Sequence, residues 1–216
     1  MNKISLKIGV FCALALGLFN ACSLDIAPIS DPSELTEGGK NDTATVILKD
    51  KAAADNQLKA IYELYRTRQE HAHLDYVILG EAHADNAYGG TTGTETTPLE
   101  VNSVDASNGN FSRDWNRYLE DIAKANVLIN GAEQLLKKGA INDAEYRLYK
   151  AQGELFRAQM MFRLARIWGS FPVITSIAKT ITSNNIEEVW PAYYPPRSTQ
   201  EECYKQIISD LEYAAQ

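Results

Sequence analysis

The stretch GELFRAQMMFRLARIWGSFPV, residues 153–173, predicts the second half of a long helix and the point where it stops. Ala158 and Ala165 lie seven residues apart, as does the alanine before them, and this spacing lets another helix approach closely. Gly169 and Pro172 follow the last apolar turn, and both residue types end helices. The stretch therefore predicts a buried helix that packs against neighbouring helices.

The start of this helix is expected at Asn142, because Asn142 and Glu145 have the spacing of a capping box. Glu154 and Arg157 lie three residues apart, so they can pair across one turn. Such a pair is usually structural and contributes a few tenths of a kcal/mol, about 0.2–0.5.

Three further helical patterns flank it. From Lys51 onward, apolar residues recur at three- and four-residue steps, and a second pattern follows Ser112, its expected cap, through Ile129. Ser198 and Glu201 form a Ser-x-x-Glu capping box that is expected to open a last helix. Only 46–48 and 173–174 are strand candidates. The fold class is mainly α, with TPR-like antiparallel helical pairs as the expected architecture, although no strict 34-residue repeat is visible.

Two irregular segments interrupt the helices. Residues 85–112 are rich in Gly, Thr, Asn and Ser and predict a long loop, and residues 187–197 read EEVWPAYYPPR. The aromatic residues expected to be exposed on these segments are Tyr88, Trp190, Tyr193 and Tyr194. Exposed rings stack on sugar faces or anchor a protein partner. The alternative is that each ring covers a helix end.

The first residues have the order of a secretory signal. Lys3 and Lys7 precede an uncharged run over 8–19, and Cys22 follows a small residue as in a bacterial lipobox. The run is shorter than the roughly 20 residues that a spanning helix needs. We expect a signal peptide at 1–21, a lipidated tether at 22–50 with Cys22 as the acylated residue, and a helical domain at 51–216. An ordinary cleaved signal or an uncleaved anchor remains the alternative.

Charge and cysteine content exclude several classes of function. Residues 1–21 hold two of the 21 basic residues and none of the 28 acidic ones, so the processed chain carries a net charge of −9. Such a chain is a poor nucleic-acid binder, and its attachment to a membrane must come from the lipid. Without Cys12 and with Cys22 acylated, Cys203 has no cysteine left with which to form a disulfide.

No catalytic or metal-binding pattern is present. The only candidates are His71, His73, His83, Glu81 and Asp85, and their spacing does not match the i, i+4 histidines of helical zinc sites. Residues 89–97 lack the Gly-Lys-Ser/Thr ending of a phosphate loop. We therefore expect neither an enzyme nor a cofactor.

Three motifs together resemble the SusD/RagB family of outer-membrane lipoproteins. They are GELFRAQMMFRLARIWGSFPV (153–173), WNRYLEDIAKANVLI (115–129) and PPRSTQEECYKQIISDLEYAA (195–215). The matched residues are Trp115, Tyr118, Ile122, Ala125, Asn126, Gly153, Glu154, Arg157, Ala158, Phe162, Gly169 and Pro172. These are expected to be helix-packing positions, and no ligand-binding residue is carried over.

The resemblance implies a TPR-like scaffold, anchored by lipid and exposed on the cell surface. It also implies a SusC-like TonB-dependent transporter as partner and an oligosaccharide, or in some members a peptide, as ligand. Family members are longer, and the last helix has a start signal without a stop signal. We therefore expect an N-terminal portion of a longer protein. The alternative functions are a lipid-anchored TPR-like adaptor that binds only proteins and, third, a surface glycosidase, which would need a carboxylate pair facing a cleft.

Overall fold

The computed structural model describes residues 47–68, 70–88, 96–181 and 185–216, and all regular structure among them is helical. In chain order the elements are α2 (Lys51–Thr67), the π-helical η2 (Glu70–Ala82), α3 (Thr97–Glu100), α4 (Gly109–Lys137), α5 (Asp143–Trp168), α6 (Ile186–Val189), the 3₁₀ turn η3 (Trp190–Tyr193) and α7 (Gln200–Ala214). The prediction of a mainly α fold is confirmed. Neither strand candidate, over its described residues 47–48 and 173–174, forms a strand.

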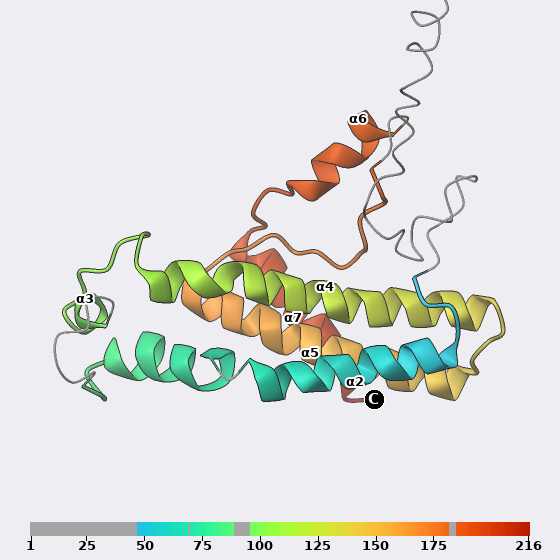
Figure 1. Ribbon diagram of the computed structural model, residues 1–216, viewed down its shortest axis with the longest axis horizontal. Coiled ribbons are helices and arrows are strands. Elements are labelled where there is room, and N and C mark those ends of the chain that lie inside the picture. The colour runs from blue at the N-terminus through green and yellow to red at the C-terminus, as the bar shows by residue number, and fades with distance from the viewer. Residues whose placement is uncertain (1–46, 69, 89–95, 182–184) are drawn as a thin grey trace, which may run out of the picture. The chain divides into compact units, whose positions relative to one another are not determined.

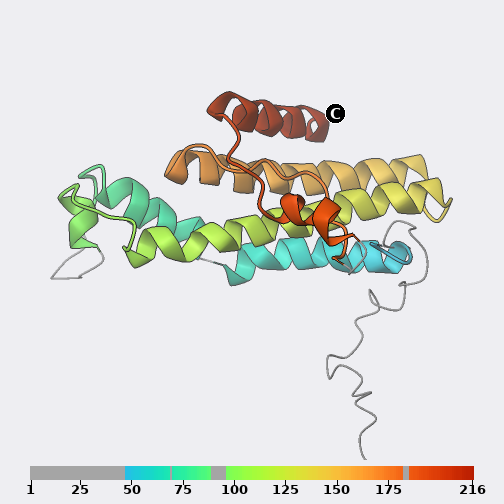
Figure 2. The same cartoon turned by 90° about the horizontal axis from the view of Figure 1, so that it is seen from above.

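Four helices lie side by side, and each runs antiparallel to its neighbour (Figure 1). Seen from above, α7, α5, α4 and α2 follow one another in that order (Figure 2). α5 packs against α4 and α7, and α2 lies against both α4 and α5. The turn between α4 and α5 is short because Gly139 adopts a positive φ of 68°, which reverses the chain at once. The expected antiparallel pairing is therefore present.

The ends of α5 follow the predicted signals. The Asn142 side chain accepts a hydrogen bond from the Glu145 backbone N–H at 3.0 Å, and the Glu145 carboxylate accepts one from the Asn142 N–H at 2.9 Å. This reciprocal pair is the predicted capping box. At the other end Gly169 has a φ of 74°, a conformation that L side chains rarely adopt.

The predicted start of α4 at Ser112 is wrong. The helix begins at Gly109, and its cap is Asn108, whose side chain accepts a hydrogen bond from the Asn110 N–H at 3.0 Å. Asparagine and serine are equally good caps, so propensity alone could not choose between them. The predicted loop over 85–112 is consequently too long, and it also contains the short helix α3.

The predicted cap of α7 is displaced by one residue. Thr199 and Glu202 form the capping box, in place of Ser198 and Glu201. Ser198 is already used by the preceding connection, because its N–H donates to the carbonyl of Phe171 at 3.1 Å and its hydroxyl accepts from a backbone N–H at 3.3 Å. A tertiary contact therefore decided between two adjacent caps.

The core lies between α4 and α5, with α2 and α7 on either side. At Gly153 the two helices are so close that a Cβ atom would lie 2.7 Å from Cγ1 of Ile129. Large core residues with little or no exposed surface are Ile61, Tyr118, Ile122, Leu128, Leu135, Tyr149, Phe156, Met161, Leu164 and Phe171. The glycine at the head of the fold-defining stretch is thus a point of close helix contact.

Aromatic rings close the end of the α4–α5 pair. The Trp168 ring packs edge-on against Trp115 and Tyr118, with centroids 5.5 and 5.7 Å apart. The Tyr118 hydroxyl donates to the Asp75 carboxylate at 3.0 Å, which ties η2 to α4. Burial raises the pKa of Tyr118 above its ordinary range, and the nearby Asp75 charge raises it further.

Candidate functional site

Cys22, the expected lipid-attachment residue, lies outside the described residues, and so does the tether as far as residue 46. Cys203 is fully buried on α7, and its sulfur lies 3.5 Å from the carbonyl oxygen of Phe171. Within the described ranges, every helix is too short or too polar to cross a membrane.

Of the histidine and carboxylate candidates, the structure describes the side chains of Glu81, His83 and Asp85. Glu81 accepts a hydrogen bond from the Asn86 side chain at 3.0 Å, and Asp85 occupies a turn with a φ of 60°. The side chains of His71 and His73 lie outside the described residues. Over the part of the chain that the structure describes, no three His, Cys, Asp or Glu side chains are placed to hold a metal ion.

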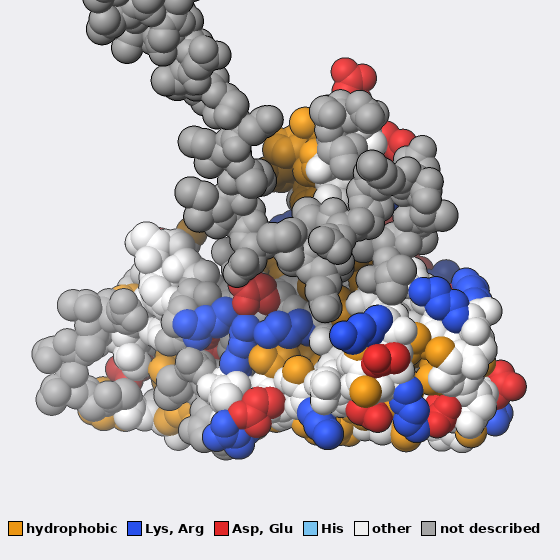
Figure 3. Space-filling model, turned by 45° about the vertical axis from the view of Figure 1, so that its right-hand side comes forward, with side chains coloured by type: hydrophobic (Ala, Val, Ile, Leu, Met, Phe, Trp, Pro, Cys, Tyr) orange, Lys and Arg blue, Asp and Glu red, His pale blue; other side chains and the backbone are white. Residues whose placement is uncertain are grey.

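The aromatic candidates are exposed. Trp190, Tyr193 and Tyr194 on and beside η3 have 49%, 45% and 68% of their surface open to solvent, and Tyr88 has 80%. The rings of Trp190 and Tyr194 lie 4.9 Å apart at an angle of 50°. In the space-filling view, hydrophobic side chains gather on the part of the chain that stands above the long helices (Figure 3). Tyr88 and Tyr194 are open over most of their surface, whereas Trp190 and Tyr193 are about half covered.

Local contacts hold this aromatic segment in shape. The Tyr193 hydroxyl donates to the backbone carbonyl of Lys179 at 3.0 Å, and the Lys179 ammonium pairs with Glu188 at 2.9 Å. The Asn185 side chain donates to the carbonyl of Thr180 at 3.0 Å. Residues 179–181 therefore contact residues 185–194, outside the helical core.

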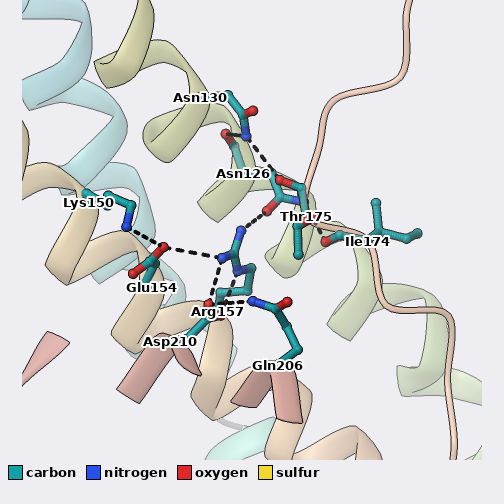
Figure 4. Close-up of polar contacts among 9 residues, drawn as sticks. All are labelled: Asn126, Asn130, Lys150, Glu154, Arg157, Ile174, Thr175, Gln206 and Asp210. Atoms are coloured by element: carbon teal, nitrogen blue, oxygen red, sulfur yellow. Dashed lines mark hydrogen bonds and ion pairs between the residues drawn. The ribbon is translucent and has the colours of Figure 1, made fainter. Parts of the chain in front are cut away.

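The connection that carries this segment is fastened to α4. The side chain of Asn126 donates to the carbonyl of Ile174 at 2.9 Å, and that of Asn130 donates to the carbonyl of Thr175 at 3.2 Å. Asn126 and Asn130 are one helical turn apart, so they bond successive carbonyls of an extended chain (Figure 4). Amide groups thus take the place of a strand partner for 174–175.

A buried arginine fixes the first of these asparagines. Arg157 on α5 donates through Nη1 to Oδ1 of Asn126 at 2.7 Å. Its Nε and Nη2 donate to the two carboxylate oxygens of Asp210 on α7, each at 2.8 Å. Gln206 donates to the same carboxylate at 2.7 Å. Arg157 has 3% of its surface exposed, so its charge is compensated by protein groups and hardly by water.

Glu154 lies beside this arginine with an incomplete set of partners. One of its oxygens is 3.1 Å from the Lys150 ammonium and 3.6 Å from Arg157, and the other has no hydrogen-bond partner in the structure. Burial raises the pKa of Glu154, although the Lys150 charge acts in the opposite direction. The expected Glu154–Arg157 pair is present, but Asp210 is the closer partner of the arginine.

Asn126 was expected only as a helix-packing position, and Asp210 was not singled out in the sequence. The structure assigns them a polar role, as the two groups that satisfy a buried guanidinium. The signal available in the sequence was that Asn126 and Asp210 each stand next to apolar positions in a helical motif. Buried polar residues of this kind are hydrogen-bonded to one another far more often than they are isolated.

Comparisons with known proteins give a consistent result. Residues 39–216 match the model of a SusD-like family described as "Starch-binding associating with outer membrane". The chain is 27% identical over 214 residues to a SusD-like protein of Bacteroides ovatus and 24% identical over 213 residues to the SusD-like protein P38 of Formosa agariphila. The description is of a binding protein, in agreement with the expectation of binding without catalysis.

Solved structures show the same fold. NanU of B. fragilis superposes with a TM-score of 0.57 at 20% identity, over 81% of this chain and 33% of that one. A SusD-like protein from B. fragilis superposes with a TM-score of 0.55 at 17% identity, over 84% and 31% of the two chains. The present chain spans 34% and 37% of the length of the two sequence relatives.

Proposed function

The chain belongs to the SusD-like family, and from this premise we propose that it is a cell-surface lipoprotein that binds oligosaccharides and delivers them to a TonB-dependent outer-membrane transporter. The observation that carries the proposal is the family match over residues 39–216. The exposed aromatic segment supports it, because rings open to solvent can stack on sugars. The proposal concerns the whole protein, because this chain spans about a third of the length of its relatives.

Anchoring through Cys22 is the first part of the proposal. The basic head, the uncharged run and the small residue before the cysteine are the features that support it. We expect a cell that expresses the chain to incorporate labelled palmitate into it, and the Cys22→Ala variant to lose the label. Cys203→Ala is the matched control, since its thiol is buried and the label should remain. Label retained in the Cys22 variant would contradict the anchor.

Glycan capture is the second part. The chain, purified in detergent, should bind neutral oligosaccharides on a glycan array and in calorimetry. Co-purification from the native outer membrane should recover a TonB-dependent transporter. Absence of binding to every sugar and peptide on the array would contradict the nutrient-binding role.

An adaptor that binds only proteins is the second candidate. It is favoured by a stripe of exposed apolar residues on α5, formed by Leu148, Leu155 and Phe162 at seven-residue steps. Surfaces of this kind often contact other proteins. Recovery of a protein partner together with a failure to bind any glycan would favour this candidate over nutrient capture.

A further inference from the structure

We propose that Trp190 and Tyr194 form a stacking site for a neutral pyranose unit, an inference that rests on the proposed oligosaccharide binding. The two side chains are separated by three residues, yet their rings lie only 4.9 Å apart. The turn η3 produces this contact by folding the chain back between them. The two rings therefore form one aromatic surface.

Solvent exposure leaves this surface available. Trp190 is 49% exposed and Tyr194 is 68% exposed, and their planes meet at 50°. A pyranose has an apolar face of C–H bonds and a rim of hydroxyl groups, so one side of it suits an aromatic ring and its edge suits polar groups.

An exposed ion pair lies on the same segment as the rings. Lys179 and Glu188 form it, and their side chains are 72% and 70% exposed. An ammonium group donates and a carboxylate accepts hydrogen bonds, and sugar hydroxyl groups take part in both. The segment therefore combines apolar rings with exposed polar groups, as ligand sites do.

The local charge favours a neutral sugar. Glu187 and Glu188 are both exposed on α6, and Glu188 already pairs with Lys179. Two carboxylates beside one ammonium leave a net negative charge, which repels uronic or sialic acid groups. The net charge of the whole chain, −7 by composition, acts in the same direction.

The backbone that carries the rings is also restricted before a ligand arrives. Pro191 follows Trp190 and Pro195 follows Tyr194, and each proline has a fixed φ, while the Tyr193 hydroxyl donates to the carbonyl of Lys179. A ring held in advance loses less conformational entropy when it binds. The surface is small, moreover, whereas a standard protein interface covers about 800 Å² on each partner. A sugar is therefore the better occupant.

The test is calorimetry of the full chain in detergent with a fixed panel of oligosaccharides. The neutral members are maltoheptaose, cellohexaose, xylohexaose and mannohexaose, and the acidic member is hexagalacturonate. For the neutral oligosaccharide that binds, we expect Trp190→Ala and Tyr194→Ala each to raise Kd at least tenfold. Trp190→Phe, which keeps a ring, should stay within about threefold of the unaltered chain.

Tyr76→Ala is the matched control, since Tyr76 is a 56% exposed aromatic residue on η2. Its Kd should equal that of the unaltered chain, and far-UV circular dichroism should show the same helix content in all variants. Unchanged Kd in both alanine variants would overturn the stacking site and leave glycan binding intact. Tighter binding of hexagalacturonate than of every neutral sugar would overturn the neutral specificity. If nothing on the panel binds, the proposed function fails and the site with it.

Discussion

Arg157 and Asp210 form a bidentate ion pair that joins α5 to α7, with both N···O distances at 2.8 Å. Both side chains are at least 96% buried. Because the same guanidinium also bonds Asn126, one side chain connects α4, α5 and α7. Asn126 in turn holds the carbonyl of Ile174, so the pair between two helices also sets the course of the chain that leads to the aromatic segment.

Breaking this pair should destabilise the fold strongly. Asp210→Asn removes the nearer of the two carboxylates beside the buried guanidinium and leaves only Glu154, at 3.6 Å. Losing one member of a buried pair costs about 3–5 kcal/mol. The measurement is the free energy of unfolding from urea titration. Lys179→Ala removes one member of an exposed pair and should change the free energy of unfolding by less than about 1 kcal/mol. Equal effects of the two substitutions would show that the buried pair contributes no more than a surface one.

Removing one asparagine should loosen the connection without unfolding the helices. Asn130→Ala deletes a hydrogen bond to Thr175, worth about 1 kcal/mol, so local opening should become about fivefold more frequent. Limited proteolysis between residues 169 and 199 reports this opening directly. Asn116→Ala, an exposed site on the same helix, is the control. Equal cleavage rates in the two variants would rule out a fastening role for Asn130.

A single methyl group should disturb the α4–α5 contact. Gly153→Ala places a Cβ 2.7 Å from Cγ1 of Ile129, and overpacking of this kind costs about 1–3 kcal/mol. Gly80→Ala, also in a helical segment, meets nothing within 4 Å and should stabilise by up to about 1 kcal/mol. Thermal unfolding of both variants should therefore shift in opposite directions. A stabilising Gly153→Ala would mean that the helices have room to separate.

Glu154 should make stability depend on pH. Its folded-state pKa is raised above the ordinary 4.5, so the folded chain holds its proton more tightly than the unfolded chain. Stability from this group is therefore present below pH 4.5 and is lost as pH rises through the folded pKa. Glu154→Gln removes this dependence. Urea titrations from pH 4 to 7 should show the variant gaining stability relative to the unaltered chain as pH rises, and a constant difference would contradict the prediction.

The exposed stripe on α5 should bind apolar dyes. Leu148, Leu155 and Phe162 lie on one face of the helix with 52%, 41% and 43% of their surface exposed, and Ile208 and Leu211 on α7 are similarly open. We expect the folded chain to enhance the fluorescence of anilinonaphthalene sulfonate. Leu155→Lys should reduce the fluorescence with little loss of stability, since exposed substitutions change it by about 0.5 kcal/mol or less. Undiminished fluorescence would place the dye elsewhere.

The long helices were predictable because their signals are local. Periodic apolar residues and the capping pair Asn142–Glu145 act within a few residues of one another, and the structure has them as expected. The caps of α4 and α7 were not predictable in this way, because Asn108 and Thr199 compete with neighbours of nearly equal capping propensity. For α7 the decision came from Phe171, a residue distant in sequence that binds the Ser198 N–H.

The site was predictable in part for the same reason. Exposure of Trp190 and Tyr194 followed from their proline-rich surroundings, which cannot continue a helix. The contact between their rings depends on the backbone of η3, and the role of Asn126 depends on a partner 48 residues away. Spacing along the chain holds no information on contacts of that range.

The two ends of the connection between α5 and α7 meet. The Ser198 N–H donates to the carbonyl of Phe171, so the first and last residues of the connection lie next to each other. A segment closed in this way can change length at small cost, about 0.6 kcal/mol for each doubling. The sequence between these two residues can therefore be exchanged or lengthened while the helices keep their register, so variation in the exposed aromatic segment need not come at the expense of the fold.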